Sequence, residues 1–101
     1  MSLYYLSGCI TAGDKATPEE ITHNIEVFNL EEARLINEGH AVFNPCKQGV
    51  GDRYEKYLVT DLLYILENKP MMLMLPNWET SLGSRIEHEM AERLGLTIEY
   101  K

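Results

Sequence analysis

One segment near the end of the chain combines side chains that could do chemistry. Residues 81–87 read SLGSRIE, with two serines, a glycine and a glutamate at an expected helix start. Free backbone N–H groups there can bind an anion, and Ser81 or Ser84 could hydrogen-bond a phosphate or a sugar hydroxyl. Glu87 follows about one turn inside the helix, where its carboxylate could attack a sugar carbon. The alternative is that Ser81 caps the helix and Glu87 is solvated.

Aromatic and thiol side chains supply further candidates. Tyr4 and Tyr5 are successive residues of an expected strand, so one faces each side of the sheet, and the Tyr5 hydroxyl could hold a carboxylate. Simple packing of Tyr5 is the alternative. Trp78 lies in a polar loop, where its ring could cover a nucleobase, pack on the fold or contact another subunit. Cys9 could be a nucleophile, although a passive thiol is favoured because no histidine adjoins it in sequence.

The sequence patterns of common metal and cofactor sites are missing. His23, His40 and His88 form no HExxH motif and no Cys–His spacing, so we expect no bound metal. The glycine-bearing segment 8–13 follows a strand but matches neither a Walker loop nor GxGxxG, so we expect no cofactor. Cys9 and Cys46 form no CxxC pair, which favours a reducing, cytoplasmic location over a disulfide framework.

These residues need elements to position them, and short apolar runs alternate with longer amphipathic ones along the chain. The expected strands are residues 3–7, 40–44, 71–75 and 96–100. The expected helices are residues 17–39, 54–68 and 82–95. This βαβαβαβ order predicts a small Rossmann-like or flavodoxin-like three-layer αβα sandwich, with a parallel sheet of about four strands.

Local signals place the helix ends and the core faces. Thr17, Pro18 and Glu20 form a recognisable helix start. Helical spacing predicts core-facing residues, which are Ile21, Ile25, Phe28, Leu35 and Ile36 in the first helix, Leu58, Leu62 and Ile65 in the second, and Leu82, Ile86, Met90 and Leu94 in the third. Asp61 adjoins Leu62 and could point to the same cleft. The apolar run 71–75 suits a strand buried on both faces.

Length and charge bound the function. The 101 residues have room for one domain, residues 1–101. Nine basic and sixteen acidic residues give a net charge of −7, which opposes binding to nucleic acid and to anionic lipid. The longest apolar run, 71–75, is far shorter than the roughly 20 residues of a membrane helix. We therefore expect a small-molecule ligand at the strand carboxyl ends, where segments 8–13, 44–52 and 77–87 should converge.

Three motifs together resemble a known superfamily. Residues 5–8 (YLSG), 39–45 (GHAVFNP) and 81–87 (SLGSRIE) are similar to the nucleoside 2-deoxyribosyltransferase-like superfamily, and more narrowly to its small DUF4406 members, common in phage and bacterial genomes. The resemblance spans nearly the whole chain. It implies cleavage of the N-glycosidic bond of a nucleoside or nucleotide, with Glu87 on the position of the glutamate nucleophile that forms a covalent deoxyribosyl intermediate. It also implies a homodimer, because relatives complete their sites with a neighbouring subunit.

The match to the deoxynucleoside monophosphate N-glycosidase branch is partial. The matching residues are Tyr5, Gly8, Ile10 and Gly13 in the first motif and Ser81, Leu82 and Gly83 in the second. Cys9 and Thr11 replace a serine and an arginine that would help hold phosphate. Asn77 and Glu79 are what this chain offers where transferases carry base-contacting aspartates. Phosphate preference and base specificity therefore stay open.

Physical chemistry agrees with the resemblance, because departure of a base from a sugar builds oxocarbenium-like charge that a carboxylate stabilises and captures. An unperturbed glutamate titrates near about 4.3, so we expect an ionised Glu87 at neutral pH. The predicted catalytic residues are Glu87 and Tyr5. The predicted substrate-binding residues are Gly8, Cys9, Ile10, Thr11, Asn44, Trp78, Ser81, Gly83 and Ser84.

The group that accepts the sugar stays open. Water as the acceptor would make the protein a hydrolase, and a second base would make it a transferase. One alternative function is a non-catalytic module that binds or sequesters a nucleotide or an ADP-ribose-type ligand. Another is a structural interaction protein that uses Trp78 and the tyrosines as an interface.

Overall fold

The fold follows the expected alternation of strands and helices. A computed structural model describes residues 2–11, 15–48 and 54–101. Its elements are β1 (Leu3–Ser7), α1 (Pro18–Asn37), β2 (Ala41–Phe43), η1 (Pro45–Gln48), α2 (Tyr54–Asn68), β3 (Met71–Met74), η2 (Trp78–Thr80), α3 (Leu82–Leu94) and β4 (Ile98–Tyr100). The βαβαβαβ order is confirmed. The Gly13 match, and part of the loop predicted over residues 46–53, lie outside the described residues.

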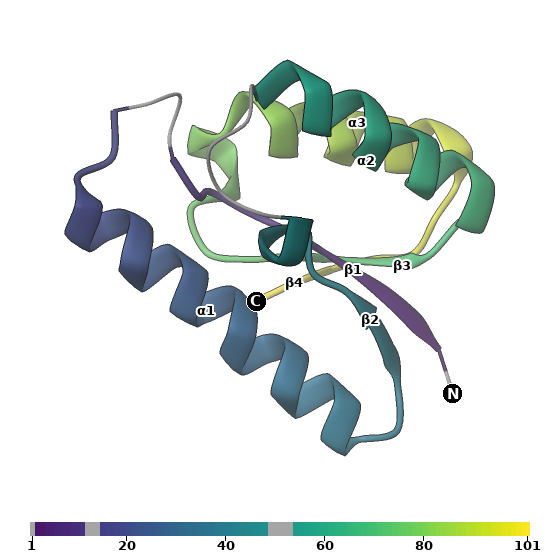
Figure 1. The fold of residues 1–101 in the computed structure, drawn as a ribbon. Coiled ribbons are helices and arrows are strands. Elements are labelled where there is room, and N and C mark those ends of the chain that lie inside the picture. The colour runs from purple at the N-terminus through teal and green to yellow at the C-terminus, as the bar shows by residue number, and fades with distance from the viewer. Residues whose placement is uncertain (1, 12–14, 49–53) are drawn as a thin grey trace.

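The four strands form one parallel sheet in the order β2-β1-β3-β4. Helix α1 covers one face, and α2 and α3 cover the other (Figure 1). The predicted three-layer sandwich is thus confirmed, with the strand order of a flavodoxin-like fold. Strand order reverses between β1 and β3, and ligands in such folds bind beyond the carboxyl ends of the strands at this point. None of the helices in the described ranges is long and apolar enough to cross a membrane.

The alternation of side chains along the strands builds two cores. The core on the α1 side contains Tyr4, Leu6, Phe28, Leu35, Leu73 and Leu75. The core on the other side contains Tyr5, Ile65, Met72, Met74 and Ala91. Consecutive residues Met72, Leu73 and Met74 therefore bury side chains on both faces, as the apolar run predicts.

Helix α1 begins where the capping signal predicts. The Thr17 hydroxyl accepts from the Glu20 backbone N–H, and the Glu20 carboxylate accepts from the Thr17 backbone N–H. Phe28, Glu31 and Leu35 form its buried stripe. The prediction that Ile36 faces the core is wrong, because Ile36 lies about 100° around the helix from Leu35 and is 55% exposed.

Helix α3 buries only part of the face that its apolar spacing predicts, since Met90 and Leu94 pack against the core as expected. Leu82 is 58% exposed, whereas the buried residues are Gly83, Ser84, Glu87 and Ala91. Three of these four are small, so the helix can approach the sheet closely. Leu82 is therefore not a core residue, and the helix turns Glu87 toward β1.

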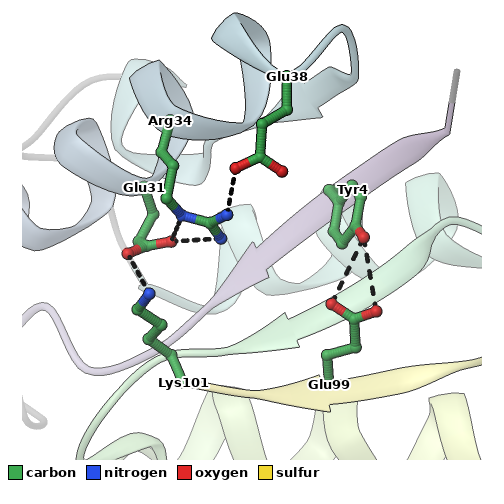
Figure 2. A network of polar contacts seen from close by, with 6 residues as sticks. All are labelled: Tyr4, Glu31, Arg34, Glu38, Glu99 and Lys101. Carbon is green, nitrogen blue, oxygen red and sulfur yellow. Dashed lines mark hydrogen bonds and ion pairs between the residues drawn. The ribbon is translucent and has the colours of Figure 1, made fainter.

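A polar network holds the end of β4 against α1. The Lys101 Nζ atom lies 3.4 Å from Glu31 Oε1, and Arg34 pairs with both Glu31 and Glu38 (Figure 2). The Lys101 backbone N–H also donates to the Met74 carbonyl. The last described residues are thus tied to β3 and, on the α1 face, to the helix.

Candidate functional site

The Glu87 carboxylate is buried against the end of β1. Tyr5 donates a hydrogen bond to Glu87 Oε2, and Ser7 donates one to Glu87 Oε1, each at 2.7 Å. Tyr5 is fully buried and Glu87 is 6% exposed. The proposed partnership of Tyr5 with Glu87 therefore has the hydrogen-bond geometry that an orienting hydroxyl requires, and Glu87 is not the solvated helix residue of the alternative interpretation.

A second carboxyl group joins this pair. Asp61 of α2 is 6% exposed and interacts with the Tyr5 hydroxyl as well as electrostatically with Glu87. Burial, followed by the charges of Glu87 and Asp61, raises the pKa of Tyr5 well above its ordinary value. Tyr5 therefore stays protonated and acts as a donor between two acidic groups.

The surroundings of Glu87 oppose its ionisation. Burial is the largest influence and raises its pKa to about 7 from an ordinary value of 4.5; Asp61 raises it further, while the hydrogen bonds from Ser7 and Tyr5 lower it. The expectation of an unperturbed glutamate is therefore wrong. At neutral pH the group is divided between its acid and its carboxylate forms, so it can either hold a proton or act as a base or nucleophile.

The two serines at the start of α3 form hydrogen bonds with other groups of the protein. The Ser81 hydroxyl accepts from the Ser84 backbone N–H, and the Ser84 hydroxyl donates to the Gly8 carbonyl at 2.9 Å. Gly83 is buried beside them. These contacts bring Ser81, Gly83, Ser84 and Gly8 to the end of β1 against which Glu87 is buried, although both serine hydroxyls have partners already.

The residues after Gly8 lie toward α1. Asn24 donates to the Ile10 carbonyl at 3.0 Å and approaches the Cys9 sulfur at 3.9 Å, and the Thr11 carbonyl accepts from Ala16 N–H. Cys9 and Asn24 border a pocket of about 120 Å³, whose other lining residues are His23, Val27, Phe28, Leu75, Pro76 and Asn77. The loop after β1 thus borders a cavity on the face of the sheet opposite Glu87.

Two candidates lie apart from the carboxylate cluster. Asn44 is buried at the end of β2, where its amide donates to Asn29 and Glu32 of α1 and its oxygen accepts from the Cys46 backbone N–H. Trp78 stacks on His88 with the ring centroids 4.4 Å apart. Asn44 therefore joins β2 to α1, and Trp78 joins η2 to α3.

The list of candidates drawn from the sequence missed Ser7 and left Asp61 out. Ser7 shares a strand face with Tyr5, two residues away, so the alternation that directs Tyr5 to Glu87 also directs Ser7 there. Asp61 has the weaker signal of an acidic residue beside Leu62 on a helix with a buried face. Ser7 could thus have been found from periodicity, whereas Asp61 needed the packing of α2 against α3.

Fold and site together define a class of protein, a small parallel α/β domain with a buried acidic cluster at the carboxyl end of its first strand. The chain belongs to the family described as "Domain of unknown function (DUF4406)", whose model matches residues 2–100. The predicted resemblance to small DUF4406 proteins is confirmed at this level. No curated protein matches the chain in sequence.

Proposed function

We propose that this protein cleaves the N-glycosidic bond of a nucleoside or nucleotide, with Glu87 as the nucleophile. The observation that carries the proposal is the buried Glu87 carboxylate held by the Tyr5 and Ser7 hydroxyls at the end of β1. A carboxylate so oriented can stabilise positive charge on a departing sugar. We further propose that the family belongs to the nucleoside 2-deoxyribosyltransferase-like superfamily, which the three motifs and the strand order support.

The chemistry proceeds in two displacements. A Glu87 oxygen attacks the anomeric carbon, the bond from that carbon to the base nitrogen breaks, and the base leaves with the electron pair and takes up a proton from solvent. Water or a second base then attacks the same carbon, loses a proton to solvent and releases the Glu87 carboxylate. Ser7 and Tyr5 hold the carboxylate throughout, and both steps leave atoms and charge balanced.

The raised pKa of Glu87 sets the working range of such a reaction. Nucleophilic attack requires the carboxylate, whose population increases as the pH rises through about 7. We therefore expect the rate of base release to increase across this range. The Asp61 carboxyl lies near enough to raise the pKa of Glu87 further.

Release of free base from a panel of nucleosides and 5′-monophosphates tests the proposal. Wild type should release base from at least one member, Glu87→Gln should lose roughly a thousandfold or more in rate, and Tyr5→Phe should retain more activity than Glu87→Gln. Glu89→Gln is the matched control, since Glu89 is an exposed glutamate of the same helix. Equal turnover by wild type and Glu87→Gln would remove Glu87 from the mechanism.

A binding module is the second candidate. The pocket of about 120 Å³ on the opposite face of the sheet favours it only as a seat for one part of the ligand, because sites that enclose a whole small molecule measure about 300–1,000 Å³. A nucleotide or ADP-ribose-type ligand held there would not meet Glu87, because that carboxylate lies on the other side of β1. Titration calorimetry should then show ligand binding while mass spectrometry shows unchanged ligand. Product formation that depends on Glu87 would contradict this candidate.

We also propose that the protein is a homodimer that associates through α2. Val59, Leu63 and Leu66 recur at spacings of four and three residues and are 60%, 50% and 45% exposed. Such spacing places them on one helix face. This stripe is uncharged in a chain of net charge −7, so two copies can bring these faces together without direct repulsion between them.

A further inference from the structure

Three side chains from three elements meet beside α3. His88 of α3 stacks on Trp78 of η2 with the ring planes 22° apart, and its Nε2 atom lies 2.6 Å from the Tyr100 hydroxyl of β4. The His88 side chain is 14% exposed. One imidazole therefore joins α3 to the turn after β3 and to the last residue of β4.

The charges around His88 come mainly from its own helix. Its Nδ1 atom lies 3.4 Å from Glu92 Oε1, one turn further along α3. Arg85, about one turn earlier, and Glu79, the charged residue of η2, are both exposed to solvent. From β4 the titratable group that faces His88 is Tyr100. The nearest charged partner of His88 is thus the Glu92 carboxylate.

Protonation strengthens the contacts that His88 makes. A neutral ring with its proton on Nδ1 donates to Glu92 and accepts from the Tyr100 hydroxyl. A second proton, taken from water onto Nε2, reverses the direction of the Tyr100 hydrogen bond and turns the Glu92 contact into an ion pair. It also places a cation against Trp78 at 4.4 Å, within the range of cation–π attraction.

We propose that His88 is a proton-operated clamp, which tightens η2 and the end of β4 onto α3 when its imidazole takes up a proton. On the other face of the sheet, the Lys101–Glu31 ion pair holds the same end of β4 to α1 (Figure 2). Both sides of the β4 end are thus anchored, and the His88 side is the one that responds to pH. Because η2 leads into Ser81, the N-cap of α3, the clamp also steadies the start of the helix that carries Glu87.

Trp78 is the only tryptophan of the chain, so its fluorescence tests the contact directly. A protonated imidazole stacked on an indole quenches its emission, and we expect emission to fall as the pH is lowered from about 8.5 to 5.5. His88→Gln should abolish this change, whereas His23→Gln, an exposed histidine of α1, should keep it. Each variant is made in a Glu87→Gln background, because the Glu87 carboxyl titrates in the same range.

Hydrogen exchange of the Lys101 amide tests the mechanical consequence, since this amide donates to the Met74 carbonyl. After correction for intrinsic rates, exchange should be roughly two- to fivefold slower at about pH 5.5 than at about pH 8. His88→Gln should remove the difference and Glu92→Gln should reduce it. The proposal is overturned if the Glu87→Gln protein with and without His88→Gln shows one fluorescence profile, or if the fluorescence responds to His88 while Lys101 exchange does not.

Discussion

At the scale of single residues, Glu87 is the group whose surroundings depart most from those of an ordinary helix glutamate. It accepts two hydrogen bonds of 2.7 Å, yet its pKa is raised to about 7, because burial outweighs the two donors. Between pH 4.5 and about 7, the folded protein keeps a proton on the Glu87 carboxyl that the unfolded chain has released. The site therefore links folding stability to pH.

The sign of this linkage gives a first prediction. Between pH 4.5 and about 7 the folded state holds the Glu87 proton more tightly than the unfolded state, so the free energy of unfolding falls as the pH rises through this window. This contribution of Glu87 to the free energy of unfolding is fully present below pH 4.5 and is lost above about pH 7. Its size is about 3 kcal/mol, from the shift in pKa.

Urea unfolding of wild type and Glu87→Gln at several pH values between 4.5 and 8 measures the contribution of Glu87 to the free energy of unfolding. Glu87→Gln should gain stability relative to wild type as the pH rises, by an amount that approaches about 3 kcal/mol. Glu89→Gln, exposed on the same helix, should follow the wild-type slope. Parallel curves for wild type and Glu87→Gln would contradict the raised pKa.

At the scale of elements, the start of α1 and the end of β1 carry the clearest local dependence on sequence. Substitution of Thr17 by alanine removes the hydroxyl that accepts from Glu20 N–H, and should lower the free energy of unfolding by about 1 kcal/mol. Thr22→Ala is the matched control, because Thr22 is an exposed position inside the same helix. Equal losses from the two substitutions would show that the cap contributes nothing of its own.

The end of β1 depends on the absence of a side chain at residue 8. A Cβ atom on Gly8 would lie 2.9 Å from Leu75 Cβ and 3.3 Å from the Phe28 ring. Gly8→Ala should therefore cost about 1–3 kcal/mol through overpacking, measured by urea unfolding. It should also displace the carbonyl that accepts from Ser84. A loss below about 0.5 kcal/mol would mean that the strand end can move without penalty.

Element boundaries were predictable here because caps and periodicity act locally. The start of α1 is predicted by its capping residues Thr17, Pro18 and Glu20. Helix α3 ends at Gly95, which has the left-handed conformation with φ of 72°. Apolar spacing predicted only part of the buried face of α3. Met90 and Leu94 pack against the core as expected, but close packing against the sheet selects Gly83, Ser84 and Ala91 over Leu82. Small residues carry little hydrophobic signal even where they decide how near two elements approach.

At the scale of the whole molecule, the strand order brings together residues that lie far apart in sequence. Tyr5 and Glu87 are separated by 82 residues and meet at 2.7 Å, which the convergence of strand ends in a parallel sheet predicts. The same rule did not bring Asn44 to this cluster, because its amide bonds to α1 instead. The convergence of loops therefore predicts the region in which the site lies, while the hydrogen-bond partners of each side chain decide which residues form it.

Association of two copies through α2 would double the mass of the particle in solution. Sedimentation equilibrium should give twice the 11.6 kDa chain mass for wild type and a monomer for Leu63→Glu, because a charge would be buried in the apolar stripe of α2. Leu30→Glu is the control, since Leu30 is 71% exposed on α1. A wild type that stays monomeric at high concentration would contradict the proposed interface.

The bond between Glu87 and a sugar is the central claim, and mass spectrometry of acid-quenched reactions tests it most directly. With a nucleoside or nucleotide that the protein cleaves, wild type should gain the mass of one glycosyl group, located by fragmentation on Glu87, and Glu87→Gln should gain none. Release of base at the same rate by both proteins, with no glycosylated Glu87 in wild type at any time point, would contradict the account.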